Sequence, residues 1–287
     1  MNINDIKKPA KTMVSFEVFP PKTEPNIESL FETISHLKKA DPAFISVTYG
    51  AGGSGTDKSV SIASRIKSEY DIEPLAHLTC VGADKKTILS VLEDMKKNDI
   101  NNVLALRGDI PKGMDKEKAF ADFTYATDLI DLISNKDDMY VMAAAYPEHH
   151  PQSPTEEDDL NYLKLKQDKG VTRFNTQLCF DTDTVIRFID DAKDMGITVP
   201  MSVGIMPILN PNQIIRMLSL SGCSIPAPLA KLFALYGNDE KEFRKFGLEY
   251  ATKQAQKLLD NGVDGIHVYT MNRYKASLSI LSDVGLI

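Results

Sequence analysis

The sequence has few cysteines and no long apolar run, and these two absences exclude several classes of protein. Its three cysteines are far apart and form no Cys-x-x-Cys pair, so neither a disulfide framework nor a zinc knuckle is expected. No stretch approaches the roughly 18 apolar residues of a membrane-spanning helix. The first residues carry charge but no apolar segment, which is unlike a signal peptide. We therefore expect a soluble, cytoplasmic protein with reduced thiols.

A linker is absent as well, and so is any low-complexity segment. No Ser/Gly/Pro-rich stretch divides the 287 residues, which suits one large α/β domain. The net charge of −7 offers no general attraction to nucleic acid or to an anionic membrane. The pair His149-His150 has no second cluster at metal-ligand spacing, so we predict no metal site.

What the sequence does contain is a repeated alternation of short apolar runs with amphipathic segments. Eight runs have the length and nearly continuous apolar character of buried parallel strands. They cover residues 13–19, 43–49, 74–80, 102–107, 139–146, 173–180, 199–206 and 265–271. Apolar residues recur at helical spacing between them, and residues 208–262 carry more than one helix. The alternation predicts a single (β/α)8 TIM barrel as one catalytic domain over 1–287, with 1–12 as an N-terminal extension.

Polar residues follow the carboxyl ends of these runs, whereas the starts of the runs are mostly apolar. Seven of the eight runs end in groups that ionise or form hydrogen bonds, namely Glu17, Thr48, His77, Arg107 with Asp109, Tyr146, Gln177 and Asn272-Arg273. In a TIM barrel the carboxyl ends of all strands meet at one face, where active sites lie. A purely structural barrel does not require this bias, so the sequence predicts one shared polar site.

One motif points to a different fold. Residues 50–55 read Gly-Ala-Gly-Gly-Ser-Gly, a literal G-x-G-x-x-G after a strand, which is typical of Rossmann dehydrogenases. That fingerprint needs a helix that starts within the glycines and an acidic residue that closes the next strand. Here Thr56 and Asp57 follow as candidate helix caps, and no acid comes after the next strand until Asp84. We interpret the segment as a flexible flap at the barrel mouth and keep the Rossmann dehydrogenase as an alternative.

Seven phrases at strand ends resemble those of the methylenetetrahydrofolate reductases and occur in the order of that family. They are SFEVFPPK (15–22), SVTYGAGGS (46–54), HLTC (77–80), ALRGD followed by IP (105–111), AAYPE (144–148), TQLCFD (176–181) and YTMNR (269–273). The resemblance covers nearly the whole chain and is to the short bacterial type, which has the catalytic barrel only.

The resemblance implies a flavoprotein that reduces 5,10-methylenetetrahydrofolate to 5-methyltetrahydrofolate and so supplies methyl groups for methionine synthesis. FAD is the implied cofactor, NADH or NADPH the electron donor, and ping-pong hydride transfer through the flavin the implied mechanism. Homo-oligomers are usual in the family. The sequence decides neither the preferred nicotinamide nor whether a partner protein supplies electrons.

The family pattern makes Glu17 and Asp109 the catalytic residues. Glu17 interrupts an apolar strand, where a carboxylate is costly unless it is paired or functional, and its family counterpart is a general acid. Protonation of N10 opens the imidazolidine ring of the folate to a 5-iminium cation, and we expect apolar flanks to raise the pKa of Glu17 for that task. The counterpart of Asp109 lies near the flavin and contacts the pterin. A simple ion pair with Arg107 is the alternative for Asp109.

Further binding residues follow from the same resemblance. Substrate binding is expected at Asp109, Gln177, Gln213 and Arg273. The amide of Gln177 suits the pterin or the nicotinamide in turn, Arg273 suits the glutamate carboxylate of folate, and a solvated role is the alternative for Gln213. FAD binding is expected at Thr48, Tyr49, Ala51, His77, Arg107, Gly108, Asp109, Tyr125, Ala126, Tyr146, His150, Asp159 and Lys166.

Two positions depart from the family pattern. Tyr162 and Leu165 stand where many bacterial relatives carry Asn and Arg, so contacts to the FAD phosphates or adenosine are lost. We expect the flavin to dissociate more readily than in those relatives. Two further alternatives remain: a flavin-free barrel lyase that uses Glu17 and Asp109 as acid and base, and a folate-binding or assembly protein without turnover.

Overall fold

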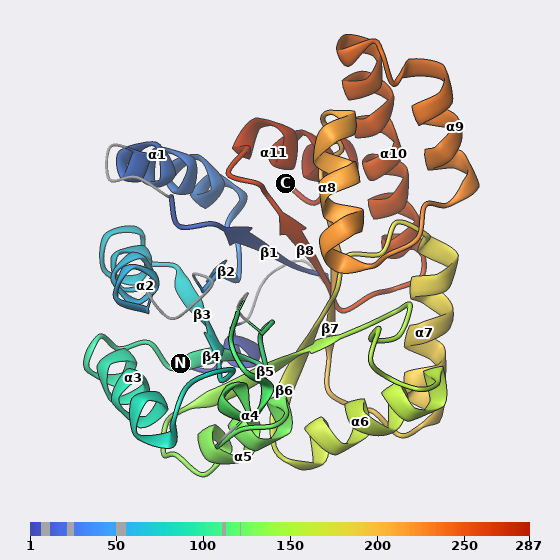
Figure 1. Cartoon of the computed structure of the whole chain (residues 1–287). Coiled ribbons are helices and arrows are strands. Elements are labelled where there is room, and N and C mark those ends of the chain that lie inside the picture. The colour runs from blue at the N-terminus through green and yellow to red at the C-terminus, as the bar shows by residue number, and fades with distance from the viewer. Residues whose placement is uncertain (7–11, 22–25, 50–55, 111–112, 121) are drawn as a thin grey trace.

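Eight parallel strands close into a barrel in sequence order, and helices surround it (Figure 1). The computed structural model describes residues 1–6, 12–21, 26–49, 56–110, 113–120 and 122–287, without the side chains of residues 56 and 57. The first strand pairs with the last, with Met13 opposite Gly265 and Glu17 opposite Tyr269. The predicted (β/α)8 barrel is confirmed. An open Rossmann sheet is excluded because this sheet closes on itself.

Each predicted apolar run overlaps one strand. The strands are β1 (Met13–Val18), β2 (Phe44–Val47), β3 (Glu73–Thr79), β4 (Asn102–Leu106), β5 (Tyr140–Ala145), β6 (Val171–Thr176), β7 (Met201–Ile205) and β8 (Gly265–Tyr269). The largest difference is at β6, which ends at Thr176, so the predicted run 173–180 includes a loop. Gln177 therefore follows a strand rather than lying inside one, and this part of the prediction was wrong.

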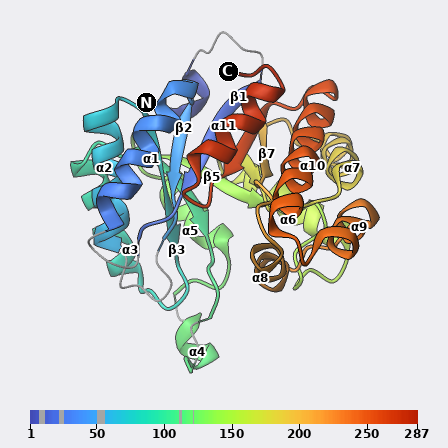
Figure 2. The same cartoon turned by 90° about the horizontal axis from the view of Figure 1, so that it is seen from above.

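The helices alternate with the strands and are α1 (Ile27–Leu37), α2 (Thr56–Tyr70), α3 (Lys85–Lys97), α4 (Lys116–Ala119), α5 (Ala126–Ser134), α6 (Glu156–Asp168), α7 (Thr182–Asp194), α8 (Pro211–Ser221), α9 (Ala227–Tyr236), α10 (Glu240–Asp260) and α11 (Tyr274–Asp283). Short 3-10 turns cover Ile3–Asp5 and Lys38–Ala40. The helix α2 begins at Thr56, after the last glycine of the run at 50–55. The proposed flap itself lies outside the described residues. In Figure 2, α4 stands apart from the body of the barrel.

Helix ends form where the sequence supplies capping groups. The Asp84 carboxylate accepts a hydrogen bond from the backbone N–H of Thr87 and so caps α3. Asn210 caps α8 in the same way, and Pro211 occupies the first turn, where a missing N–H costs nothing. None of the described helices is both long and apolar enough to cross a bilayer.

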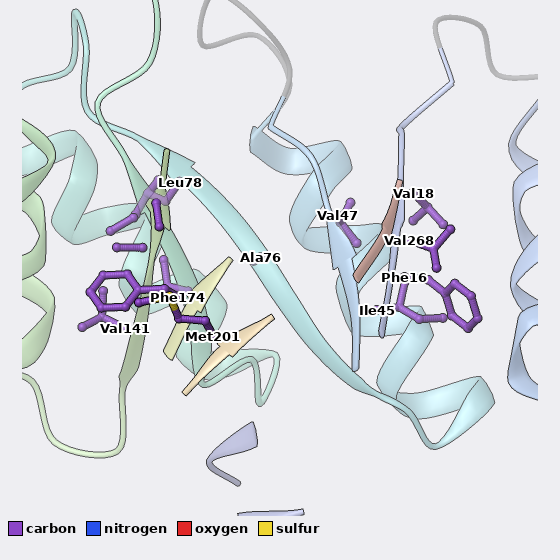
Figure 3. Packing of buried hydrophobic residues seen from close by; sticks show 14 of the residues in the cluster. Phe16, Val18, Ile45, Val47, Ala76, Leu78, Val141, Phe174, Met201 and Val268 are labelled. Carbon is purple, nitrogen blue, oxygen red and sulfur yellow. The ribbon is translucent and has the colours of Figure 1, made fainter. Parts of the chain in front are cut away.

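The main core fills the space between the sheet and the helices. Along β1, Phe16 and Val18 join this core, and Figure 3 shows them beside Val268 of the neighbouring β8. Ser15 and Glu17 alternate with them and contact groups inside the barrel. Because successive side chains of a strand face opposite sides of the sheet, the carboxylate of Glu17 points toward the barrel axis.

The amino-terminal residues close the end of the barrel where the strands begin. Ile3 is 1% exposed and packs with inward side chains of β2 to β5. Its N–H donates to Asn102 Oδ1 at 3.1 Å, and Arg173 donates to Asn4 Oδ1 at 2.9 Å. Residues 1–6 of the predicted extension thus form the floor of the barrel.

Candidate active site

A cavity of about 580 Å³ lies at the carboxyl ends of the strands. Nine of the site residues predicted from the sequence line it: Glu17, Thr48, His77, Arg107, Gly108, Asp109, Tyr146, His150 and Gln177. They come from β1 to β6 and the loops that follow these strands. The structure thus brings together groups that are spread over 161 positions of sequence, from Glu17 to Gln177.

Glu17 is buried between two histidines. Its Oε2 lies 3.3 Å from His77 Nε2 and 3.8 Å from His267 Nε2. The Ser46 hydroxyl donates to the same oxygen at 3.4 Å. The side chain of Glu17 is 9% exposed, and that of His267 is fully buried. A carboxylate at this depth is stabilised only by such partners.

The pKa of Glu17 is lowered, whereas the sequence predicted a raised pKa. Burial is the largest single influence and raises the pKa, but hydrogen bonding and the positive charges of His267 and His77 together outweigh it and lower the pKa to about 2. The predicted raised pKa rested on the apolar neighbours of Glu17 along β1, whereas the two histidines act on the carboxylate from β3 and β8. The expectation of a raised pKa was therefore wrong.

His267 extends this polar group toward the floor of the barrel. Its Nδ1 lies 2.8 Å from Ser15 Oγ, and its Nε2 lies 3.4 Å from Ser46 Oγ. Beyond β8, the hydroxyl of Thr270 donates to the carbonyl oxygen of Glu17 at 2.6 Å. Both the side chain and the backbone of Glu17 are thus held by the last strand and its loop.

The wall formed after β4 and β5 carries the predicted cationic and aromatic groups. Arg107 donates to Gln152 Oε1 at 2.5 Å, and in the described part of the chain it forms no ion pair with Asp109. Gly108 has φ +85°, and a Cβ there would lie 2.8 Å from Val81 Cγ1, so only glycine fits without strain.

Tyr146 and His150 meet edge to face, with their ring centroids 4.8 Å apart. Burial, assisted by the charges of Asp159 and Asp109, raises the pKa of Tyr146 to about 12, so its hydroxyl stays protonated. Burial lowers the pKa of His150, and the neighbouring Arg107 adds to that effect. Both side chains are therefore neutral near pH 7 and suit contacts with an aromatic ring.

Lys166 and Asp159 lie behind this wall rather than on it. Lys166 Nζ donates to the carbonyl oxygen of Ala144 at 2.8 Å and lies 6.0 Å from the centroid of the Tyr146 ring. Burial lowers the pKa of Lys166 to about 8, although Asp159 opposes the shift. The Asp159 carboxylate accepts a hydrogen bond from Ser153 Oγ at 2.7 Å.

Several predicted residues do not line the cavity. Tyr125 precedes α5 and is 61% exposed, and Ala126 begins that helix. Tyr49 packs against the main core. Arg273 precedes α11 and is exposed. Ala51 lies outside the described residues.

Of the residues predicted to bind substrate, only some line the cavity. Gln177 Oε1 accepts the N–H of Leu178 at 2.8 Å, so the amide nitrogen is the part of this side chain available as a donor to a ligand. Gln213 does not line the cavity, but its Oε1 is buried without a hydrogen-bond partner in the described structure. Gln213 belongs to α8, and Leu220 and Ser221 of the same helix do line the cavity. The solvated alternative for Gln213 is disfavoured by that burial.

Sequence reasoning missed three polar residues of the cavity and its floor, two of them buried and Tyr269 half-buried. They are Asn175 on β6, and His267 and Tyr269 on β8. The alternation of side chains along a strand provided a signal, because residues two positions apart face the same side. Asn175 is two residues before Gln177, and His267 is two residues before Tyr269, which begins the phrase YTMNR. Tyr269 donates to the carbonyl oxygen of Thr176 at 2.6 Å, and burial raises its pKa.

A (β/α)8 barrel with one polar cavity at the carboxyl ends of its strands has the architecture of a barrel enzyme. Within the described residues, no three His, Cys, Asp or Glu side chains gather as metal ligands. The sequence profile "Methylenetetrahydrofolate reductase" matches residues 2–285. The chain belongs to the methylenetetrahydrofolate reductase family.

Individual relatives agree with this assignment. Methylenetetrahydrofolate reductase (NADH) 1 of Arabidopsis thaliana is 37% identical over 99% of this chain, and 5,10-methylenetetrahydrofolate reductase of Escherichia coli is 35% identical over 95% of it. The chain spans 50% of the plant protein but 90% of the bacterial one.

A solved structure of a Clostridium thermocellum protein that binds two copies of 5-methyl-5,6,7,8-tetrahydrofolic acid has a TM-score of 0.68. It is 16% identical, and the match covers 96% of this chain and 95% of the other. At that identity the similarity supports the barrel fold alone.

Proposed function

We propose that the protein reduces 5,10-methylenetetrahydrofolate to 5-methyltetrahydrofolate, with NADH or NADPH as the electron donor and FAD as its cofactor, in a ping-pong cycle. The observation that carries the proposal is the buried carboxylate of Glu17, which lines the same cavity as Asp109 and Gln177. The product would supply methyl groups for methionine synthesis. The plant relatives named for NADH favour that donor.

The residues present suit FAD. Arg107 and Lys166 offer positive charge for a diphosphate, and Tyr146 and His150 offer neutral rings. Gly108 lets backbone approach a ring closely. FAD, when bound, supplies the two-electron chemistry that allows nicotinamide and folate to react in separate half-reactions.

Glu17 is the residue that delivers a proton to the substrate. Because the pKa of Glu17 is lowered to about 2, its carboxylate is ionised near pH 7, and the proton that it delivers must first reach it from a neighbouring group. Transfer from His77 Nε2 to Glu17 Oε2 crosses 3.3 Å. Substrate that fills the cavity excludes water and favours the neutral acid, which then protonates N10 and opens the imidazolidine ring.

The other predicted residues position the substrate and balance its charge. Asp109 carries a carboxylate at the cavity rim, where it stabilises the cation that ring opening produces. Gln177 donates from its amide nitrogen to the pterin or the nicotinamide in turn. Gln213 and Arg273 contact the folate, and Arg273 at the exposed start of α11 binds its glutamate carboxylate.

One spectroscopic experiment tests the proposal. The purified protein should show a flavin absorbance spectrum, which anaerobic NADH should bleach and methylenetetrahydrofolate should then restore. A protein without flavin, even after incubation with FAD, would contradict the proposal and favour the barrel lyase. Bleaching by NADH without recovery on addition of methylenetetrahydrofolate would exclude the proposed acceptor.

A further inference from the structure

Asn175 is a buried amide without hydrogen-bond partners that lines the cavity. Its side chain comes from β6, two residues before Gln177, and the residue is 4% exposed. Neither Asn175 Nδ2 nor Asn175 Oδ1 has a hydrogen-bond partner in the described structure. An unpaired amide at that depth destabilises a fold, because both polar atoms lose their hydrogen bonds to water.

The residues two positions before and after Asn175 both form hydrogen bonds within the protein. Arg173, two residues earlier, donates to Asn4 Oδ1 and Ser202 Oγ, each at 2.9 Å. Gln177, two residues later, uses its oxygen for the N–H of Leu178. Asn175 differs from both, since its donor and its acceptor are left to whatever enters the cavity.

A second buried asparagine, Asn102, has a structural role and serves as the comparison. Asn102 on β4 is 1% exposed, and its Oδ1 accepts the N–H of Ile3. Its Nδ2 donates to the carbonyl oxygen of Met1 at 2.9 Å and to Glu73 Oε1 at 3.1 Å. Asn102 therefore holds the floor of the barrel together, and no comparable role is available to Asn175.

We infer that Asn175 is a further ligand-binding residue, which pairs with the N–H/C=O edge of a fused pyrimidinone ring. An amide offers one donor beside one acceptor, and that edge offers the complementary pair. The ring chemistry is common to the pterin of folate and to the isoalloxazine of FAD. The inference rests on the proposed function and adds to it a residue that the family resemblance did not assign.

The test uses Asn175→Leu, which keeps a similar size but removes both polar atoms, with Asn102→Leu as the matched control. In the protein stripped of ligands, we expect the Tm of Asn175→Leu to equal or exceed that of the wild type, because an unsatisfied amide is removed. We expect the Tm of Asn102→Leu to fall, because its paired hydrogen bonds are lost. If Asn175→Leu does not accumulate, Asn175→Val provides the same comparison with a residue that favours strands.

Ligand binding then identifies the ring. If the pterin is the partner, the KM for methylenetetrahydrofolate should rise at least about tenfold in Asn175→Leu, the rate of flavin reduction by NADH should stay within about twofold, and the Tm increase produced by 5-methyltetrahydrofolate should shrink. If FAD is the partner, FAD retention on dilution should fall instead.

A Tm of Asn175→Leu and Asn175→Val that falls as in Asn102→Leu would overturn the inference, because the amide would then be structural. Unchanged KM, FAD retention and ligand-induced Tm increase would overturn it too. A wild-type protein that binds neither FAD nor 5-methyltetrahydrofolate would instead refute the proposed function itself, so the two failures are distinguishable.

Discussion

His77 Nε2 lies 3.3 Å from Glu17 Oε2, and each of the two side chains is less than one-tenth exposed. Water screens little at such a site, so a charge on the imidazole acts strongly on the carboxylate. His267, on the neighbouring strand β8, adds to this effect at 3.8 Å from the same oxygen. The acidity of Glu17 is therefore set by β3 and β8 together rather than by its own strand.

Stability at acidic pH should report this pairing. Because the folded-state pKa of Glu17 is about 2 and its ordinary value is 4.5, the carboxylate stabilises the fold fully above about pH 4.5 and loses this contribution as the pH falls toward 2. The shift corresponds to roughly 3 kcal/mol. Denaturation of Glu17→Gln and the wild type between pH 6 and 2 should show a difference that shrinks on acidification. Glu93→Gln, at an exposed carboxylate of α3, is the control, and an equal slope in both variants would contradict the pairing.

Catalysis should separate into two half-reactions in Glu17→Gln. The variant keeps size and polarity but cannot donate a proton from a carboxyl, so folate reduction should fall by about 10² to 10⁴-fold. Flavin reduction by NADH should stay near the wild-type rate. Stopped-flow absorbance measures both steps. Glu73→Gln, at the other end of the barrel, should spare both, and an equal loss of both steps in Glu17→Gln would make Glu17 structural.

Flavin retention should depend on pH through Lys166. Its pKa of about 8 means that the ammonium is lost as the pH rises through 8, which removes positive charge next to the proposed diphosphate site. FAD dissociation, measured by flavin fluorescence after dilution, should therefore accelerate between pH 7 and 9.5 in the wild type. Lys166→Met should dissociate quickly at every pH, whereas Lys164→Met, on the same helix, should behave as the wild type. A wild-type FAD dissociation rate that does not change with pH would argue against a role of Lys166 in FAD binding.

Leu165→Arg tests the departure from the bacterial family pattern. Leu165 is 41% exposed on α6, on the helix that bears Lys166, so an arginine can be accommodated there without repacking the core. A charge-assisted hydrogen bond to a phosphate should slow FAD dissociation by about tenfold. Leu235→Arg, at an exposed leucine of α9, adds the same charge elsewhere. If both variants retained FAD equally, net charge rather than position would be the cause.

Gly204→Ala should disturb the cavity wall from the side of β7. An added Cβ would lie 2.4 Å from the Tyr269 ring and 2.8 Å from the carbonyl oxygen of Thr176, so Tyr269 would have to move. We expect a loss of about 1–3 kcal/mol in the free energy of unfolding and slower folate reduction. Chemical denaturation of Gly204→Ala, Tyr269→Leu and the double variant should be non-additive. Additive losses of unfolding free energy would show that Gly204→Ala does not act through Tyr269.

The barrel was predictable because its strands are buried on both sides and therefore appear as apolar runs of strand length. The polar strand ends were predictable for a related reason: a residue such as Glu17 or Gln177 stands out against apolar neighbours, and parallel strands carry such residues to one face. Local pattern was sufficient in both cases.

What could not be predicted depends on contacts between distant strands. The pKa of Glu17 is set by His77 and His267, which lie 60 and 250 positions away in sequence. The unpaired state of Asn175 is equally invisible in sequence, because the similar residue Asn102 is fully paired by the amino-terminal residues. Register and side-chain geometry decide these properties, and neither is encoded in a local motif.

The seam between the first and last strands has a consequence for how the protein is made. Thr270 holds the carbonyl oxygen of Glu17, and Asn272 binds both the N–H and the C=O of Phe19 through its side chain. A ribosome makes β1 long before β8, because Glu17 and its partner Thr270 are 253 positions apart in sequence. A nascent chain that lacks β8 would hold Glu17 only loosely, so we expect the surroundings of this carboxylate to form only after β8 has joined the barrel.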